Sequence, residues 1–138
     1  MYTLPYPIPT WLQRAIRYCA LQWHAERLPD CDGRFLQVVL ASRYAESMDG
    51  IAEVVAEAYP EWGFWTPEQR RLMLSMVIIN HALVVAQTAW EAEKMQVIAL
   101  REYPAVVRGE VLEAIALGER AQQVLLNLRS LLDRVMPI

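Results

Sequence analysis

The sequence predicts an all-α protein, a helical bundle of about four principal helices preceded by an extended N-terminal arm. Glycine is scarce, with five residues that stand singly, and eight prolines divide the chain into long segments. These segments are rich in alanine and leucine and lack the apolar–polar alternation that marks strands. Because the chain has 138 residues and is 55% hydrophobic, residues 10–138 are expected to form one domain with its own core.

The arm covers residues 1–9, where three alternating prolines favour an extended backbone. Tyr2 and Tyr6 give the arm side chains with which to dock. Thr10 is the expected N-cap of a first helix over residues 11–28. One face of this helix carries Leu12, Ile16, Cys19, Ala20 and Trp23.

A second helix is expected over residues 34–47 and a short third helix over 50–58, with Ser47 or Asp49 as the cap of the third. A continuous helix over 34–58 is the alternative, in which an internal glycine would cost about 1 kcal/mol relative to alanine. The side chains expected to face inward are Phe35, Leu36, Val39, Leu40, Ile51, Val54, Val55 and Ala58.

An aromatic loop over residues 59–65 precedes the clearest local signal in the chain, Thr66-Pro-Glu-Gln69. This signal combines an N-cap threonine, a proline at the first helical position and a glutamine at the capping-box position. A long helix is therefore expected from 66 to 103, about 36 residues and about 54 Å at 1.5 Å per residue.

The last helix is expected over residues 105–135, after Pro104 forces a turn. Apolar residues recur in it every seven positions along two seams, and a third row widens the apolar face. This width indicates a helix that packs against more than one neighbour, because a two-stranded coiled coil needs a narrower seam. The rows are Val107, Ala114, Ala121, Leu128 and Val135; Val111, Gly118, Leu125 and Leu132; and Leu117, Val124 and Leu131.

Nineteen consecutive residues, Leu72 to Trp90, carry no formal charge. Their length nearly matches a bilayer, but Asn80 and His81 fall at the middle, where a polar side chain is most costly in lipid. The other helices are amphipathic and need a partner face, so we predict the central helix of a bundle rather than a membrane span. His81 is expected to donate a hydrogen bond to a backbone carbonyl or to a side chain of a neighbouring helix.

The net charge is −3 and the pI about 5.4, which excludes a chain-wide affinity for polyanions. Residues 1–45 nevertheless hold five arginines against three acids, a net charge of +2. Candidate contacts to the phosphates of a nucleic-acid backbone are Arg14, Arg17, Arg27 and Arg34. Ordinary surface arginines paired with acids are the alternative.

Cysteine usage and the N-terminal residues bear on localisation. Cys19 and Cys31 are expected as buried or half-buried thiols in a reducing cytoplasm, with a disulfide between them as the alternative. The N-terminal sequence lacks a basic region and an apolar run, so no signal peptide is expected. The expected location is the cytoplasm, or a virion if the chain is a coat subunit.

No glycine-rich phosphate loop, Ser/His/Asp order, CxxC pattern or Glu-x-x-His spacing is present. No metal, cofactor or catalytic residue is therefore expected, and the chain is not expected to be an enzyme. Arg17-x6-His24 resembles the arginine-to-histidine element of the HEPN helical ribonucleases, which makes a ribonuclease the remote alternative. Two acidic pairs resemble those of all-α nucleotide pyrophosphatases, although their order departs from that family. The pairs are Glu46 with Asp49 and Glu110 with Glu113.

Without catalytic residues, the chain is expected to be a structural or assembly protein that associates with copies of itself. Its arm, long helices and high apolar fraction look like the organisation of the helical coat subunits of filamentous viruses, which contact nucleic acid through arginines. A homo-oligomer is expected, with Tyr2 and Tyr6 packed on another copy. The alternative is a small regulator of the phage or plasmid type that binds a host protein through Trp62, Phe64 and Trp65. These three aromatic residues could instead plug one end of the bundle.

Overall fold

The computed structural model describes the backbone of residues 4–45, 47–102 and 108–136 and the side chains of 4–45, 47–97 and 112–136. The all-α class is confirmed: these residues form five α-helices and one short 3-10 helix, with no strand among them. The elements are α1 (Thr10–Ala25), α2 (Gly33–Ala41), α3 (Met48–Ala58), η1 (Pro60–Phe64), α4 (Pro67–Glu102) and α5 (Arg108–Val135).

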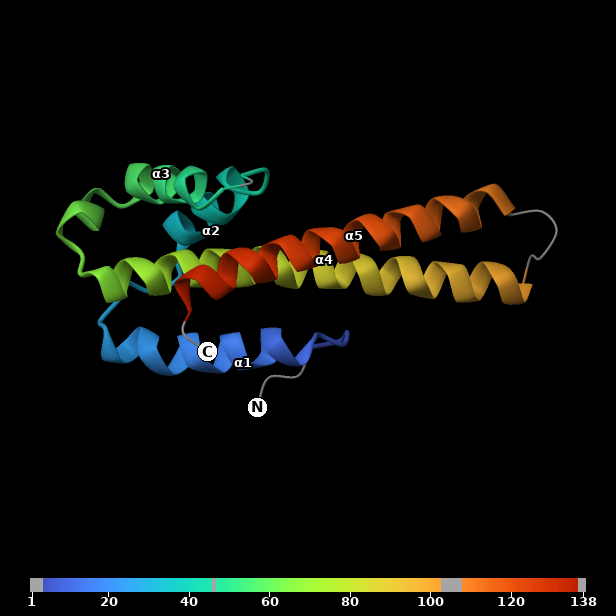
Figure 1. The fold of residues 1–138 in the computed structure, drawn as a ribbon, viewed down its shortest axis with the longest axis horizontal. Coiled ribbons are helices and arrows are strands. Elements are labelled where there is room, and N and C mark those ends of the chain that lie inside the picture. Colours follow the sequence, from blue (N-terminus) through green and yellow to red (C-terminus); the bar gives the residue numbers. More distant parts are fainter. Residues whose placement is uncertain (1–3, 46, 103–107, 137–138) are drawn as a thin grey trace.

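Helix α4 is the axis of the molecule, and the other four α-helices of the described chain pack against it. Helix α1 lies along one side of α4, α2 and α3 lie along the other, and α5 runs antiparallel beside α4 (Figure 1). Met73, Val77 and Ile78 in the first half of α4 are fully buried. The prediction of a central core helix is therefore confirmed.

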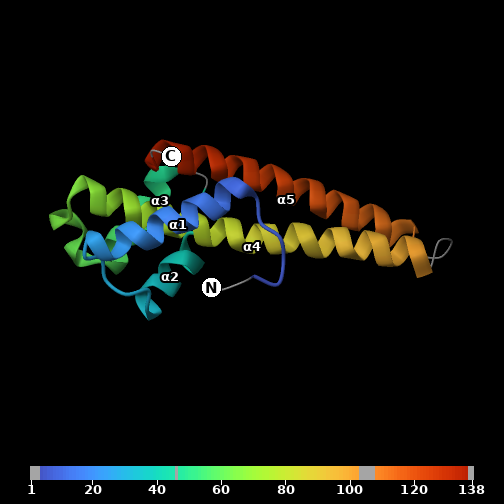
Figure 2. The same ribbon diagram turned by 90° about the horizontal axis from the view of Figure 1, so that it is seen from below.

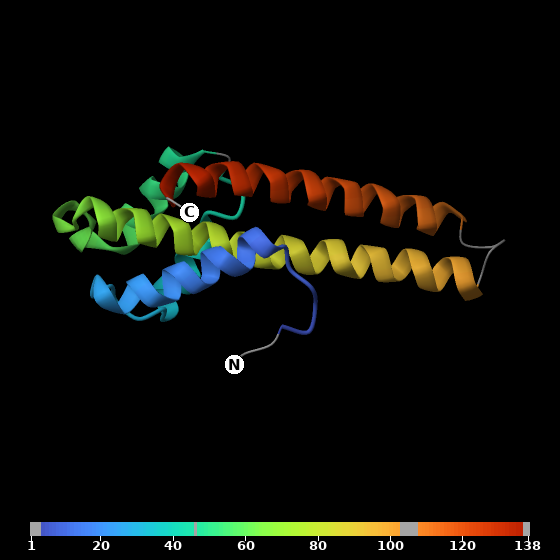
Figure 3. The ribbon, with the colours of Figure 1, turned by 60° about the horizontal axis from the view of Figure 1, so that its bottom comes forward.

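Helices α4 and α5 extend well beyond the other helices (Figures 1, 2 and 3). The contiguous core reaches Ala86 in α4 and Leu125 in α5. We call residues 87–102 and 108–124 the distal hairpin. Apart from the arm, the described chain offers these two helical segments only each other as neighbours.

Both ends of α1 differ from the prediction. The helix begins at Thr10, and Pro9 occupies the N-cap position without a side-chain hydrogen bond, so the expected cap by Thr10 is wrong. The helix also ends earlier than expected, because Arg27 adopts a φ of 54°. This left-handed residue lets the amide of Leu28 donate to the carbonyl oxygen of Trp23 at 3.2 Å, which closes the helix.

Helix α2 is shorter than predicted, and its buried stripe is narrower. It ends where the hydroxyl of Ser42 donates to the carbonyl oxygen of Val38 at 2.6 Å. Phe35 and Val38 are buried, whereas Leu36 and Leu40, which were predicted to face inward, are 58% and 52% exposed. The reason is that this short helix contacts α3 and α4 along one stripe and leaves its other face to solvent.

Helix α3 begins at its own N-cap. The hydroxyl of Ser47 accepts a hydrogen bond from the amide of Gly50 at 3.1 Å, which confirms Ser47 as the cap. The alternative of one continuous helix over 34–58 is therefore wrong. Ile51 and Val55 are buried as predicted.

The capping box at the start of α4 is confirmed. The amide of Gln69 donates to Thr66 Oγ1 at 3.1 Å, and the amide of Thr66 donates to Gln69 Oε1 at 2.9 Å. Gln69 Nε2 also donates to the carbonyl oxygen of Glu26 at 2.9 Å, which ties the start of α4 to the end of α1. Helix α4 has 36 residues, and Tyr103, its predicted end, lies outside the described residues.

The two seams of α5 are confirmed where side chains are described. The buried members are Ala114, Ala121, Leu125, Leu128 and Leu132. The third row is buried only in part: Leu131 packs against the core, whereas Leu117 and Val124 are exposed. Val107 and the side chain of Val111 lie outside the described part of the chain.

Cys19 and Cys31 are both free thiols, so the alternative of a disulfide between them is not realised. Cys19 lies in the core, where burial raises its pKa to about 12 and its Sγ is 3.9 Å from Met136 Sδ. Cys31 is exposed, so the expectation of a buried or half-buried thiol is wrong for this residue.

Candidate interaction surfaces on and beside the distal hairpin

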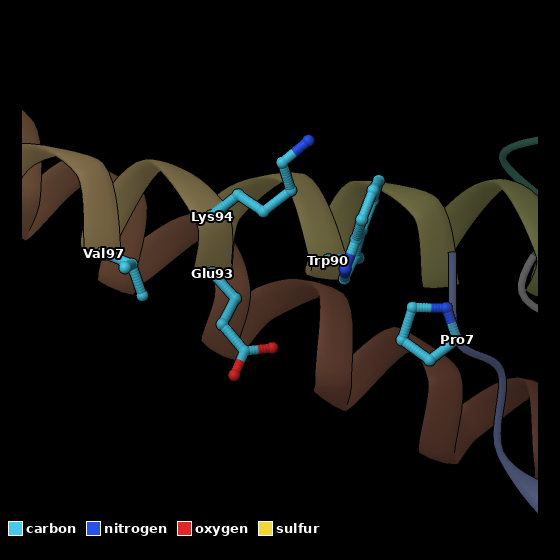
Figure 4. A pocket seen from close by; sticks show the side chains of 5 residues that line it. All are labelled: Pro7, Trp90, Glu93, Lys94 and Val97. Carbon is cyan, nitrogen blue, oxygen red and sulfur yellow. The ribbon is translucent and has the colours of Figure 1, made fainter. Parts of the chain in front are cut away.

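The arm packs on α4 of its own chain. The hydroxyl of Tyr6 donates to the carbonyl oxygen of Leu83 at 3.2 Å, and its ring centroid lies 6.3 Å from that of Trp90. The ammonium group of Lys94 lies 4.2 Å from the centroid of the Trp90 ring. Figure 4 shows the adjoining pocket of about 400 Å³, which is lined by Pro7, Trp90, Glu93, Lys94 and Val97.

Tyr6 thus uses both its hydroxyl and its ring within its own chain. Tyr2 lies outside the described residues. The packing of the arm on another copy stays a prediction.

The two helices of the distal hairpin meet through small side chains. Ala89 and Ala92 of α4 and Ala114 and Ala121 of α5 are buried. A Cβ atom placed on Gly118 would lie 3.7 Å from the Cβ of Ala92, so the helices are close together at this point. Because an alanine side chain buries little apolar area, this seam contributes less to stability than the leucine- and isoleucine-rich core of the other half.

One flank of the hairpin continues the side of the bundle on which α1 packs. The guanidinium of Arg129 in α5 lies 5.7 Å from the centroid of the Trp11 ring in α1. Ile115 and Leu126 precede Arg129 by fourteen and three residues, which places them on the same flank of α5. Val97 of α4 joins them, since it lines the pocket beside the arm. Val97 and Ile115 of the hairpin are 51% and 36% exposed, and Leu126, just beyond the hairpin's last residue in α5, is 56% exposed.

The opposite flank continues the side on which α2 packs. His81 of α4 contacts α2, and Met95 lies fourteen residues further along, on nearly the same side of the helix. Leu117 and Val124 of α5 are seven residues apart, on the flank opposite that of Arg129. Met95, Leu117 and Val124 are 56%, 38% and 42% exposed. The hairpin therefore carries exposed apolar side chains on both flanks.

The aromatic residues after α3 form a packed pair and one exposed ring. The ring centroids of Trp62 and Trp65 lie 5.7 Å apart, and that of Trp65 lies 5.5 Å from the buried ring of Tyr59. Arg70 Nε donates to the carbonyl oxygen of Trp62 at 3.1 Å, which fixes this turn on α4. Phe64 is 92% exposed. Two of the three predicted aromatic residues thus plug the end of the bundle, and Phe64 is displayed to solvent.

The four candidate phosphate contacts do not form one cluster. Arg14 and Arg17 lie one turn apart on α1 and are exposed. Arg27 follows the end of α1, about 15 Å further along at 1.5 Å per residue. Arg34 Nη1 lies 3.2 Å from a carboxylate oxygen of Glu61, the pairing with an acid that the alternative interpretation expected. The structure therefore places only Arg14 and Arg17 side by side.

His81 bonds to α2, which confirms the expected contact with a side chain of a neighbouring helix. Its Nε2 lies 2.9 Å from Ser42 Oγ. Because the serine hydroxyl already donates to the carbonyl oxygen of Val38, the histidine Nε2–H is the donor in this pair. A protonated Nε2 cannot accept the serine proton, so the pair lacks the arrangement of a nucleophile with its base. Burial lowers the pKa of His81, which favours this neutral ring.

The remaining sequence candidates give no assembled site. Arg17 and His24 are both exposed on α1. The acidic pairs cannot be placed, since Glu46 and the side chain of Glu110 lie outside the described residues. Within the described part of the chain, no three His, Cys, Asp or Glu side chains are grouped so that they could hold a metal ion.

Among the described residues, one helix is long and apolar enough to cross a membrane by length and composition, namely α4 over Pro67–Val97. In its most apolar window, 56% of the residues are buried inside the protein. A buried core helix has the same length and composition, and α4 contributes residues from Leu72 to Ala86 to the hydrophobic core.

Comparisons of the chain with models of protein families, with curated proteins and with solved structures found no match.

Proposed function

We propose that the protein is a non-enzymatic, self-associating helical subunit whose distal hairpin is the interface between copies. The observation that carries this proposal is the exposure of apolar side chains on both flanks of the hairpin, including Met95, Val97 and Leu117. A two-helix hairpin can bury only the faces that its helices turn toward each other. Here those faces hold alanines and a glycine, so the larger apolar side chains remain for a partner.

A second copy of the chain can bury these exposed apolar side chains, because its own hairpin carries the same apolar rows. Pairing of two hairpins would make a four-helix bundle, in which each hairpin covers one flank of the other. The second flank of each hairpin would then still be exposed. We therefore expect assemblies larger than a dimer.

The test is the size of the assembly in solution, measured by analytical ultracentrifugation over a range of concentrations. Two double variants remove one flank each: Met95→Gln with Leu117→Gln, and Val97→Gln with Ile115→Gln. Both should reduce the size of the assembly, and because these side chains are exposed in the single chain, helical content measured by circular dichroism should stay unchanged. A wild-type chain that stays monomeric at high concentration would contradict the proposal.

The matched control replaces two leucines that lie outside the hairpin and are more exposed than the four side chains changed in it. Leu21 of α1 is 75% exposed and Leu36 of α2 is 58% exposed. Leu21→Gln with Leu36→Gln should therefore leave the size of the assembly unchanged. A loss of association in this control would show that apolar surface in general, rather than the hairpin, drives assembly.

Nucleic-acid contact, as in a coat-type subunit, is supported by two of the four arginines, Arg14 and Arg17, which lie together and exposed on α1. Binding to duplex DNA should then weaken steeply with salt, and replacement of both arginines by glutamine should reduce the slope of that dependence. Arg34 should contribute little, since it pairs with Glu61.

The second candidate function is a small regulator that binds a host protein, and the exposure of Phe64 favours it. This ring protrudes from a turn that Arg70 fixes on α4, and rigid aromatic side chains dominate binding hot spots. A monomer or dimer in the size measurement would favour this function. Phe64→Ala should then abolish capture of the partner without a change in stability.

A further inference from the structure

A cavity of about 790 Å³ lies between the arm, α1 and α4, on the side of α4 away from α2. Its walls are mainly apolar: Ile16 of α1 and Met76, Ile79 and Leu83 of α4 line it, together with arm residues such as Ile8. Small-molecule sites are mostly apolar concave spaces of this size with a few convergent polar groups.

Four residues with polar side chains line the cavity: Tyr6, whose hydroxyl donates to the carbonyl oxygen of Leu83, and Gln13, Arg17 and Asn80. Two of them already use their amide nitrogen, because Gln13 Nε2 donates to the carbonyl oxygen of Ile8 at 3.2 Å and Asn80 Nδ2 donates to that of Met76 at 2.8 Å. Arg17 makes no ion pair with an acid among the described residues. Its guanidinium is therefore the group that can bind a ligand.

The charge of the cavity wall is positive. Arg17 is the only charged residue among the described residues that line the cavity, and no aspartate or glutamate is among them. An apolar space with one arginine and no acid matches a ligand that has an apolar body and one anionic group. A carboxylate would accept two parallel hydrogen bonds from the guanidinium.

We propose that this cavity binds a single-chain amphiphile with an anionic head group, of the fatty-acid type. The carboxylate pairs with Arg17, and the alkyl chain lies along Ile16, Met76 and Leu83 beneath the arm. This inference does not depend on self-association, because the cavity is formed within one chain and none of the exposed apolar side chains of the distal hairpin lines it.

Calorimetric titration with laurate, below the concentration at which it forms micelles, tests the proposal. The wild-type chain should bind laurate, and Arg17→Gln should weaken the affinity about tenfold, as expected for loss of a hydrogen bond to a charged group. Arg14→Gln is the matched control, since Arg14 is exposed one turn away on the same helix and does not line the cavity. It should leave the affinity unchanged.

Two further probes test the apolar part of the site and its charge preference. Ala20→Trp places a large ring in the cavity from an exposed position of α1 and should block binding, while circular dichroism reports an unchanged fold. Dodecyltrimethylammonium has the same chain length with a positive head group and should bind at least tenfold more weakly than laurate, because it repels Arg17.

Three results would overturn the proposal: no binding of laurate, equal affinity of the wild type and Arg17→Gln, or equal affinity for the cationic amphiphile. Sedimentation with phosphatidylglycerol vesicles distinguishes a free amphiphile from a lipid in a membrane as the ligand. Binding of free laurate without sedimentation with vesicles supports a soluble ligand, as proposed. Sedimentation with vesicles without binding of free laurate would overturn the site and assign this surface to membrane contact.

Discussion

At the scale of single residues, Arg27 adopts a backbone conformation that its residue type disfavours. Its φ of 54° lies in the left-handed region, where a residue with a Cβ is strained by about 1 kcal/mol or more. Glycine commonly ends helices at this position because it lacks that strain. Arg27→Gly should therefore raise the free energy of unfolding, measured with chemical denaturant, by about 1 kcal/mol.

A glycine substitution of the preceding residue is the control for that gain in stability. Glu26 has a φ of −90°, which a residue with a side chain adopts without strain. Glu26→Gly should therefore lower the free energy of unfolding, because glycine adds freedom to the unfolded chain. If Arg27→Gly is also destabilising, the left-handed end of α1 is not strained.

His81 should make stability depend on pH. Burial lowers its folded-state pKa below the ordinary value of 6.5, so between that lowered pKa and 6.5 the unfolded chain binds more protons than the folded chain. The stability associated with the neutral ring is present above pH 6.5 and is lost as the pH falls through the folded pKa. His81→Gln should flatten this dependence in denaturant midpoints measured across the acid range, whereas His24→Gln, at an exposed position, should preserve it.

At the scale of elements, Gln69 joins two helices. Its side-chain oxygen completes the capping box with Thr66, and its Nε2 donates to the carbonyl oxygen of Glu26. Gln69→Glu keeps the acceptor and loses the donor, whereas Gln69→Ala loses both. The loss of each hydrogen bond should lower the free energy of unfolding, measured by denaturant titration, by about 0.5–1.5 kcal/mol. If the two variants are equally stable, the cap does not contribute.

The ends of the helices show which boundaries a sequence can predict. Ser47 and Thr66 were predicted as caps and are caps, because a cap depends on side chains within three residues of it. The end of α2 differs from the prediction: the helix ends before Ser42, whose hydroxyl lies 2.9 Å from Nε2 of His81, a residue far along the chain. The end of α1 was missed because nothing local marks Arg27 as left-handed.

The candidate interface was only partly predictable for a related reason. The sequence showed three apolar rows on the last helix, and the structure shows that α4 covers two of them where side chains are described. The unequal lengths of the predicted helices were the feature of the sequence that indicates an uncovered segment. Helix α4, with 36 residues, is about 54 Å long and α1, with 16 residues, about 24 Å. A bundle with such unequal members must leave part of its longest helix uncovered.

At the scale of the whole molecule, the apolar sequence of α4 should not direct the chain into lipid. Met73, Val77 and Ile78 are fully buried against other helices, so a membrane would have to replace packing that already exists. Expression without detergent should give protein in the supernatant after high-speed centrifugation. Recovery of the chain only in the membrane fraction would contradict the burial of these residues in protein.

Shortening a buried side chain of α4 should lower the stability of this core. Ile78→Ala removes a fully buried side chain and should lower the free energy of unfolding by about 2–5 kcal/mol. Val84→Ala is the control on the same helix, since Val84 is 61% exposed. Its effect in thermal or denaturant unfolding should be within about 0.5 kcal/mol.

The seam of alanines between the two long helices has a consequence for local opening. Backbone amides of α4 between Leu72 and Ala86 lie along the core and should exchange their hydrogens with solvent only on global unfolding. Amides beyond Ala86 are held by a thinner apolar contact and should exchange through smaller, more frequent openings. One unbroken helix would then contain two regions with different exchange rates. Assembly should slow exchange in the second region alone, so the difference in deuterium uptake between dilute and concentrated protein would mark where copies meet.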